Sequence, residues 1–297
     1  MSMALARPTE AYRSYLPLVA QMAGTGYALI PVKQSVLDEI TGVYRLGRQF
    51  FARPSAEKHR FAVPAYVEGY REIGPEYSLV PNRPDLTESF SMWYRNVNRP
   101  VFADWAADCP LYPGIRHCAD TLSEVTADLF RAMAELWSPG APRLGFQKAS
   151  YIQLNYYEPA QHTRDLLQDP HEDGHLITLV RANAPGLEIQ IGDRYVAVEP
   201  AENELLVMAG SILSLMTGDL VPPLYHQVRN TFRTDPRYSL MFFVNPEIDQ
   251  KLEPWIRNAS NAGIDIIERA VNAPNQFGLP TLIDGDKGLG KLIETKA

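Results

Sequence analysis

The chain of 297 residues is 45% hydrophobic and 21% charged, so it has enough apolar side chains to bury a sizeable core. Its formal net charge of −7 disfavours nucleic acid as a partner, because phosphate binding requires a basic surface. Two cysteines, Cys109 and Cys118, are too few for a disulfide framework and are typical of reduced thiols. Arg7, Glu10 and Arg13 interrupt any apolar N-terminal run, and no stretch reaches the ~18 apolar residues of a membrane span. We therefore expect a cytoplasmic protein with no membrane partner.

The first half of the chain is predicted to be helical and mixed. Apolar residues at helical spacing indicate two long amphipathic helices, which we expect to pack on a core. The region between them is rich in Pro, Tyr and Arg and is predicted to be loop and edge strand. The predicted elements are a helix over residues 10–23, a strand over 27–30, a helix with Ser35 as its cap that ends at Pro54, the mixed region 55–110, and a helix over 114–137.

From residue 149 the pattern changes to short apolar runs separated by turn residues. Gly192 and Asp193 separate two of these runs and predict a hairpin turn. Eight short strands within about a hundred residues are typical of a double-sheet jelly roll. The predicted strands cover residues 150–156, 176–181, 187–191, 195–198, 204–208, 211–215, 225–230 and 238–244.

The expected fold class is mainly β with flanking helices around a double-stranded β-helix, or jelly-roll, core. We predict one structural unit in three parts. Residues 1–148 form a helical and mixed N-terminal region, residues 149–246 the jelly-roll core, and residues 247–297 a C-terminal helix and tail. Ile264, Ile267 and Val271 are spaced as on one face of that helix.

The residues with the clearest chemical meaning are His171, Asp173 and His226. A His and an Asp two residues apart point to the same side of a β-strand, and His226 is placed on a later strand of the same barrel. Two imidazoles and one carboxylate on one face of a metal leave the other face open, which suits non-haem Fe(II). A lone histidine is more commonly a satisfied polar residue, so the prediction depends on the whole set.

A zinc hydrolase is the first alternative. His171, Glu172 and His175 fit the pattern H-E-x-x-H, in which both histidines share one helix face and the glutamate acts as a base. Gly174 inside the motif costs a helix about 1 kcal/mol relative to Ala. The apolar, β-branched run at residues 176–180 predicts a strand instead. The pattern therefore favours iron.

Several motifs recur together along the chain. They are H-x-D at His171 and Asp173, the distal His226, R-x-S at Arg237 and Ser239, N-x-Y at Asn155 and Tyr157, and Gly26-Tyr27, Gly69-Tyr70 and residues 85–90 in the N-terminal part. With these motifs the chain resembles the isopenicillin N synthase-like family of Fe(II)- and 2-oxoglutarate-dependent oxygenases. The resemblance extends over most of the chain.

This resemblance implies an enzyme that uses Fe(II), with 2-oxoglutarate as co-substrate and O2. It implies that His171, Asp173 and His226 hold the metal, and that Arg237, Ser239, Asn155 and Tyr157 bind 2-oxoglutarate. An arginine suits the far carboxylate of this co-substrate, because a guanidinium binds carboxylates through paired hydrogen bonds.

Residues that alternate with Arg237 are expected to face the same interior. Met241 and Phe243 share its strand parity and would form an apolar wall near the prime substrate. His175 has the parity of His171 and Asp173, so it either contacts substrate or packs in the core, and we favour packing.

The expected reaction is the oxidation of an unactivated C–H bond of a small molecule, by hydroxylation, desaturation or cyclisation, in the biosynthesis of a specialised metabolite. No obligatory protein partner is indicated. An R-x-S motif also occurs in isopenicillin N synthase, which uses no 2-oxoglutarate, so an Fe(II) oxidase of that kind stays open. Asn155 and Tyr157 favour the 2-oxoglutarate reading. A zinc hydrolase and a non-catalytic jelly roll are the remaining alternatives.

Overall fold

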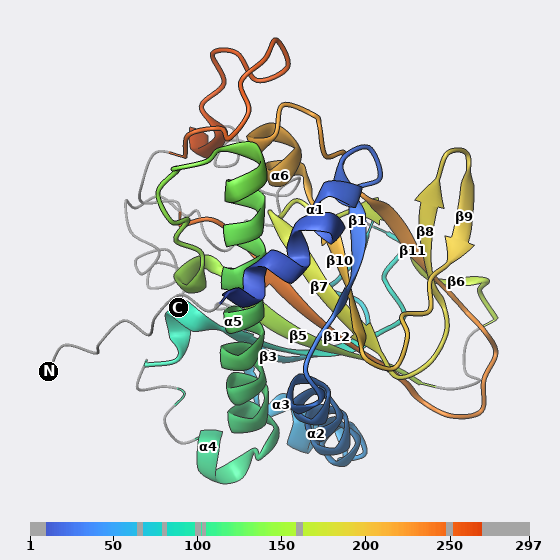
Figure 1. Ribbon diagram of the computed structural model, residues 1–297. Helices are drawn as coiled ribbons and strands as arrows, with labels where there is room; N and C mark the ends of the chain where they lie inside the picture. The colour runs from blue at the N-terminus through green and yellow to red at the C-terminus, as the bar shows by residue number, and fades with distance from the viewer. Residues whose placement is uncertain are drawn as a thin grey trace, which may run out of the picture.

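Two antiparallel β-sheets build the centre of the protein (Figure 1). The structure is a computed structural model that describes residues 10–63, 68–78, 82–98, 102, 105–158, 163–247 and 252–268. The larger, eight-stranded sheet has the order β1-β10-β7-β12-β5-β4-β3-β2, and the smaller, four-stranded sheet has the order β6-β11-β8-β9. The strands are β1 (Tyr27–Pro31), β2 (Ala62–Val63), β3 (Glu68–Arg71), β4 (Glu88–Trp93), β5 (Tyr151–Tyr157), β6 (Leu166–Glu172), β7 (Ile177–Ala182), β8 (Leu187–Ile191), β9 (Arg194–Ala197), β10 (Glu204–Ala209), β11 (Tyr225–Arg229) and β12 (Arg237–Val244).

Helices cover the outer face of the larger sheet. The long helices α2 (Gln34–Phe51) and α5 (Leu111–Trp137) pack against each other and against β5, and Gly47 of α2 allows an approach so close that a Cβ there would lie 2.4 Å from Leu154 Cδ2. The shorter helical segments are a 3-10 turn at Glu10–Tyr15, α1 (Leu16–Met22), α3 (Ser55–His59), a 3-10 turn at Tyr94–Asn96, α4 (Trp105–Asp108), a 3-10 turn at Gln147–Ala149 and α6 (Ser211–Met216).

The two faces of the larger sheet bury different side chains. On β5, Ile152 and Leu154 belong to the main core beneath the helices, whereas Gln153 and Asn155 line a cavity on the other face. A second, smaller apolar cluster lies between the sheets and includes Val180, Met241 and Val228. The alternation of the strand therefore separates an apolar outer face from a polar inner face that looks toward the smaller sheet.

Most predicted elements are confirmed, including both long helices, the strand before Pro31 and the hairpin turn, where Gly192 joins β8 and β9 with a φ of +59°. The jelly-roll architecture is also confirmed. The mixed region contributes more regular structure than expected, because β3 and β4 continue the larger sheet and β2 forms its edge. Helix α2 begins at Gln34 with Lys33 as N-cap, so the prediction of Ser35 as cap is wrong.

The predicted strand at residues 211–215 is wrong, because this segment forms helix α6. A short apolar run cannot be assigned to strand or helix by periodicity alone. Gly210 is the N-cap of this helix, and its backbone lies so close to the chain at His175 that an added Cβ would be 2.1 Å from the His175 carbonyl oxygen.

The C-terminal prediction is only partly testable. Residues 266–268 form a helical turn with Ile266 buried, whereas Val271 and the tail lie outside the described residues. Within the described ranges, no helix has the length and apolar character needed to cross a membrane.

The substitution Gly210→Ala is expected to lower the free energy of unfolding by about 1–3 kcal/mol, as overpacking does, because its Cβ would also lie 2.6 Å from the Asp173 carbonyl oxygen. Gly42→Ala is the matched control. Gly42 lies in α2 with nothing within 4 Å of an added Cβ, so this change should stabilise the protein by roughly 0.5–1 kcal/mol. Urea denaturation measures both effects. Equal stability of Gly210→Ala and the unaltered protein would contradict the close contact of Gly210 with the backbone at Asp173 and His175.

Candidate metal and co-substrate site

The pairing of two strands brings the predicted histidines together. In the smaller sheet β6 runs antiparallel to β11, and His171 lies directly opposite His226 in the register. Asp173 follows β6 one residue after its end and is 8% exposed. Ligand atoms of these three residues all lie within 4.8 Å of one another, so the structure assembles the predicted set at one point.

Each histidine is oriented by a backbone carbonyl. His171 Nδ1 lies 2.7 Å from the Asp169 oxygen, and His226 Nδ1 lies 3.2 Å from the Leu224 oxygen. In both rings the Nδ1–H donates to the carbonyl, which leaves the Nε2 lone pair for a metal. Burial and the nearby His171 lower the pKa of His226 to about 4, against the opposing effect of Asp173. The ring is therefore neutral at pH 7, as a metal ligand must be.

Asp173 is prepared in the same way. The Thr178 hydroxyl donates to Oδ2 at 2.5 Å, and Oδ1 lies 3.9 Å from His226 Nε2. Burial alone raises the pKa of Asp173, but the three neighbouring histidines and the Thr178 hydrogen bond together hold it below the ordinary value. One oxygen of an ionised carboxylate thus remains for a cation, at a point where two imidazole nitrogens converge.

Arg237 is a buried cation with unused hydrogen-bond donors. It begins β12, is 4% exposed, and donates through Nε to the Pro185 oxygen at 3.1 Å. Its Nη1 and Nη2 are buried and have no hydrogen-bond partner among the described residues. The guanidinium carbon lies 4.9 Å from the centre of the Tyr157 ring. A buried guanidinium with free donors is costly unless an anion completes it.

A cavity of about 60 Å³ lies between the sheets at the three metal-ligating side chains. Ser239, Met241 and Phe243 of β12 line it, as does Asn155 of β5. The Asn155 amide nitrogen donates to the Tyr157 hydroxyl at 3.3 Å, and that hydroxyl donates to Gln168 Oε1 at 2.7 Å. The remaining lining residues are Gln153, Gln168, His171, Asp173, Val180, Leu187, Met208, His226 and Val228.

His175 does not join the metal ligands. The group that can hold an ion comprises His171, Asp173 and His226. His175 is 4% exposed, its ring centre lies 4.8 Å from that of Phe243 and 5.6 Å from that of Tyr151, and burial lowers its pKa to about 4. It is not among the residues that line the cavity, which is consistent with the favoured packing role.

The geometry required for a zinc hydrolase is not formed. His171 lies in strand β6, one residue before its end, rather than in a helix, so His171 and His175 share no helix face. The Glu172 carboxylate accepts a hydrogen bond from the Ser211 hydroxyl at 2.5 Å. The zinc-hydrolase alternative is therefore wrong.

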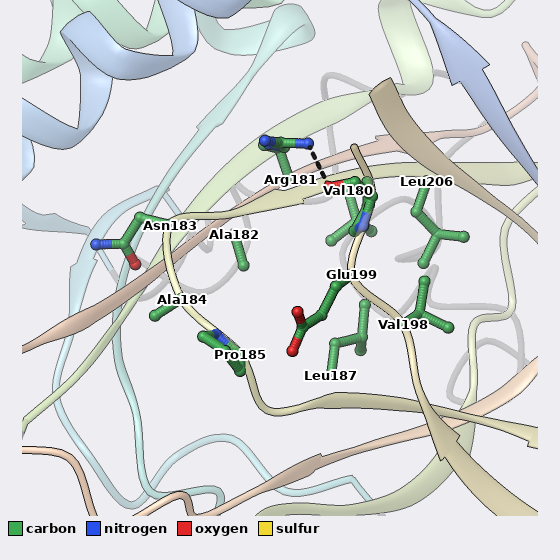
Figure 2. Close-up of a pocket in the computed structure, with 11 residues that line it drawn as sticks. Val180, Arg181, Ala182, Asn183, Ala184, Pro185, Leu187, Val198, Glu199 and Leu206 are labelled. Carbon is green, nitrogen blue, oxygen red and sulfur yellow. Dashed lines mark hydrogen bonds between the residues drawn. The ribbon is translucent and has the colours of Figure 1, made fainter. Parts of the chain in front are cut away.

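A second cavity, of about 160 Å³, adjoins the first, because Val180 and Leu187 line both. Figure 2 shows its wall of small and aliphatic side chains from β7, β8, β10 and the segments between them. Glu199 supplies the one carboxylate among its lining residues. Arg181 closes one side by donating to the oxygens of Ala201 and Glu204.

Sequence reasoning missed several polar residues around the cavity. Gln153 has the strand parity of Asn155 and Tyr157, so alternation alone could have identified it. Gln168 and Arg71 approach from other strands, and no local signal in the sequence marks them, whereas Asp85 begins the 85–90 motif, which gave no sign of its place at the cavity.

Comparison with known proteins agrees with this site. The sequence model of the 2OG-Fe(II) oxygenase superfamily matches residues 149–246. Isopenicillin N synthase from Penicillium rubens is 29% identical over 140 residues, which cover 45% of this chain and 42% of that protein. Gibberellin 2-beta-dioxygenase 5 from Oryza sativa is 27% identical over 151 residues, which cover 47% of this chain and 44% of that protein. The matched region thus spans less than half the length of these relatives.

Solved structures show the same fold over nearly the whole chain. Dioxygenase for auxin oxidation 1 from Arabidopsis thaliana, in its complex with 2-oxoglutarate, has a TM-score of 0.68 at 18% identity, over 86% of this chain and 96% of that chain. A putative 2OG-Fe(II) oxygenase family protein from Caulobacter crescentus has a TM-score of 0.69 at 22% identity, over 90% of this chain and 94% of that chain. The likeness of these structures shows the jelly-roll fold, and the sequence model of the 2OG-Fe(II) oxygenase superfamily matches its core, residues 149–246.

Replacing His171, Asp173 or His226 by Ala is expected to weaken Fe(II) binding roughly 100-fold or more, since even outer partners of metal ligands contribute 10- to 100-fold. His175→Ala is the matched control and should bind Fe(II) like the unaltered protein. Iron retained after anaerobic desalting gives the comparison. The assignment fails if His175→Ala loses the metal while His226→Ala keeps it.

Proposed function

We propose that the protein is an Fe(II)- and 2-oxoglutarate-dependent oxygenase that oxidises an unactivated C–H bond of a small molecule. The observation that carries this proposal is Arg237, which is buried with both Nη atoms unpartnered among the described residues and has the strand parity of Ser239, a residue that lines the metal cavity. The donor set of two imidazoles and one carboxylate fits Fe(II) with an open face.

Charge balance favours a dicarboxylate co-substrate. Fe(II) with the Asp173 carboxylate carries one net positive charge, and Arg237 adds a second positive charge nearby. A dianion such as 2-oxoglutarate would neutralise both, whereas a neutral ligand would leave two buried cations without counter-charge. The paired Nη donors of Arg237 match a carboxylate, and the Ser239 hydroxyl lies two residues along on the same face.

Fe(II), 2-oxoglutarate and O2 would supply the oxidising chemistry, and the side chains would supply position and a dry site. His171, Asp173 and His226 would hold the metal. Arg237 and Ser239 would bind the far carboxylate of 2-oxoglutarate with Tyr157 as a third donor, and Asn155 would steady the carboxylate nearer the metal. Met241 and Phe243 would press the target C–H bond toward the metal and exclude water.

The wider assignments are proposals of the same kind. The N-terminal part (1–148), the core (149–246) and the C-terminal part (247–297) would form one structural unit, which the continuation of the larger sheet by β3 and β4 supports. Relatives whose names refer to small molecules, such as gibberellin 20 oxidase and mugineic-acid 3-dioxygenase, support a small-molecule substrate and a role in specialised biosynthesis. Buried, unpaired Cys109 and Cys118 are compatible with the cytoplasm.

An Fe(II) oxidase without 2-oxoglutarate is the second candidate. The likeness to isopenicillin N synthase over 140 residues favours it. In that case Arg237 would bind the prime substrate itself. Stoichiometric release of succinate separates the two candidates, because the oxidase releases none. Full turnover without 2-oxoglutarate would overturn the leading proposal.

Arg237→Lys is expected to raise the KM for 2-oxoglutarate by roughly one to two decades, because losing a charge-assisted hydrogen bond costs about 1.5–3 kcal/mol and an ammonium cannot replace the fork. Arg237→Ala should raise it further, since the counter-charge is lost. Iron affinity should stay unchanged, which serves as the internal control. If only the KM for the prime substrate rises, Arg237 does not bind 2-oxoglutarate.

Phe243→Ala is expected to uncouple the reaction, so that succinate forms in excess of oxidised substrate, while 2-oxoglutarate affinity changes little. Phe243 lines the cavity and its ring stacks on Tyr151 at 4.6 Å between centres, so its loss enlarges the site. Tyr225→Ala, an exposed aromatic on β11, is the matched control. The ratio of succinate to product measures the effect, and an unchanged ratio would contradict the wall assignment.

A further inference from the structure

A continuous chain of hydrogen bonds runs along the metal cavity from Arg71 in β3, through β5 and β6, to Asp85, which precedes β4. Arg71 Nη2 donates to Gln153 Oε1 at 2.5 Å, and Gln153 Nε2 donates to Asn155 Oδ1 at 2.8 Å. The Asn155 amide donates to the Tyr157 hydroxyl at 3.3 Å, which donates to Gln168 Oε1 at 2.7 Å. Gln168 Nε2 then donates to Asp85 Oδ2 at 3.2 Å. We name these six residues the polar chain.

The direction of the polar chain is determined at its ends. An arginine can only donate, so Gln153 has to present its carbonyl oxygen to Arg71 and its NH2 group to Asn155. Each following amide or hydroxyl must then accept on one side and donate on the other. At the far end Asp85 receives the Gln168 amide, and the Ser78 hydroxyl also donates to it at 2.8 Å. Arg71, which can only donate, and the Asp85 carboxylate, which can only accept, thus both require hydrogen bonds that are donated from Arg71 toward Asp85.

Asn155 is the link that matters for the site, because it lines the metal cavity. Its Oδ1 is engaged by Gln153, and one hydrogen of its NH2 group is engaged by Tyr157. The other hydrogen has no hydrogen-bond partner within the described ranges. In the reverse direction the Asn155 carbonyl oxygen would take the place of this NH2 group beside Tyr157, and its lone pair would repel a carboxylate at the metal.

We infer that Arg71 is a positioning residue, which acts through Gln153 to turn the NH2 group of Asn155 toward the carboxylate of the co-substrate. This inference rests on the proposed function. Arg71 does not line the cavity and is not a metal ligand, so its effect is exerted through the orientation of two amides. It pairs with Glu76 and donates to Ser91 at 2.9 Å, and these contacts hold its guanidinium in place.

The test compares variants at the start of the polar chain. Arg71→Met removes the obligatory donor, and about tenfold weaker 2-oxoglutarate binding is expected, as for the loss of one well-placed hydrogen bond. Arg71→Lys keeps a group that only donates and should restore most of the affinity. Binding is measured anaerobically by titrating the Fe(II)-loaded protein with 2-oxoglutarate and following the metal-to-ligand absorption band, without turnover.

Glu76→Gln is the matched control. It removes the ion pair of Arg71 but leaves the Arg71 donors and keeps an amide oxygen that can accept from Gln153 Nε2, as Glu76 Oε2 does at 3.5 Å, so 2-oxoglutarate affinity should stay as in the unaltered protein. Gln153→Met cuts the polar chain at the next link while both charges of that ion pair stay in place, and it should weaken binding like Arg71→Met. This second variant decides the matter if Arg71→Met does not fold. Fe(II) affinity should be the same in all four variants.

The outcomes separate this inference from the proposed function. If the unaltered protein shows no absorption band with 2-oxoglutarate, the proposed function fails. If it binds 2-oxoglutarate and both Arg71→Met and Gln153→Met bind it equally well, the inference alone is overturned. Equal loss in Glu76→Gln and Arg71→Met would also overturn it, because the ion pair rather than the direction of the polar chain would then be responsible.

Discussion

The antiparallel pairing of β6 with β11 is the constraint on which the rest of the site depends. Because His171 and His226 are opposite each other in this register, their rings leave the sheet on one side at a ring-centre distance of 4.3 Å. A shift of the β6–β11 register by one residue would turn one ring to the other face of the sheet, so the two histidines could no longer bind one ion. The carbonyls of Asp169 and Leu224 then complete the geometry by fixing each ring through its Nδ1–H. The orientation of the metal ligands is thus a property of strand pairing.

The larger sheet divides two tasks between its faces. Its outer face, with Ile152, Leu154 and Phe242, is fully buried beneath the helices and stabilises the fold through apolar contact. Its inner face carries Gln153, Asn155 and Ser239, whose polar atoms are costly to bury unless they are paired. Most are paired with one another. The Nη atoms of Arg237 have no partner among the described residues, which supports the proposal that an anion binds there.

The metal ligands were predictable from the sequence because their signal is local or depends on a simple period. His171 and Asp173 are two residues apart, and Arg237, Ser239, Met241 and Phe243 alternate along one strand. Helix α6 was not predictable, because its apolar run has no distinguishing period and its start depends on the close contact of Gly210 with a distant loop. The polar chain was hidden for a related reason. Arg71 is separated from Gln153 by 82 residues and Gln168 from Asp85 by 83, so these residues come together only when the chain is folded.

The first turn of α6 is hydrogen-bonded to the loop that carries Asp173. The backbone N–H of Ser211 donates to the Asp173 oxygen at 3.0 Å, that of Ile212 to the His175 oxygen at 3.2 Å, and that of Gly210 to the Leu176 oxygen at 3.1 Å. Docking of this helix and the position of a metal-ligating residue are therefore thermodynamically linked. An ion that binds at Asp173 stabilises the docked helix by RT ln(1 + [L]/Kd), where [L] is the free ion concentration and Kd its dissociation constant. Loosening of the helix lowers the binding free energy of the ion by the same amount. Binding of an ion at Asp173 is therefore expected to slow hydrogen exchange of the backbone amides in α6, although this helix lies outside the cavity.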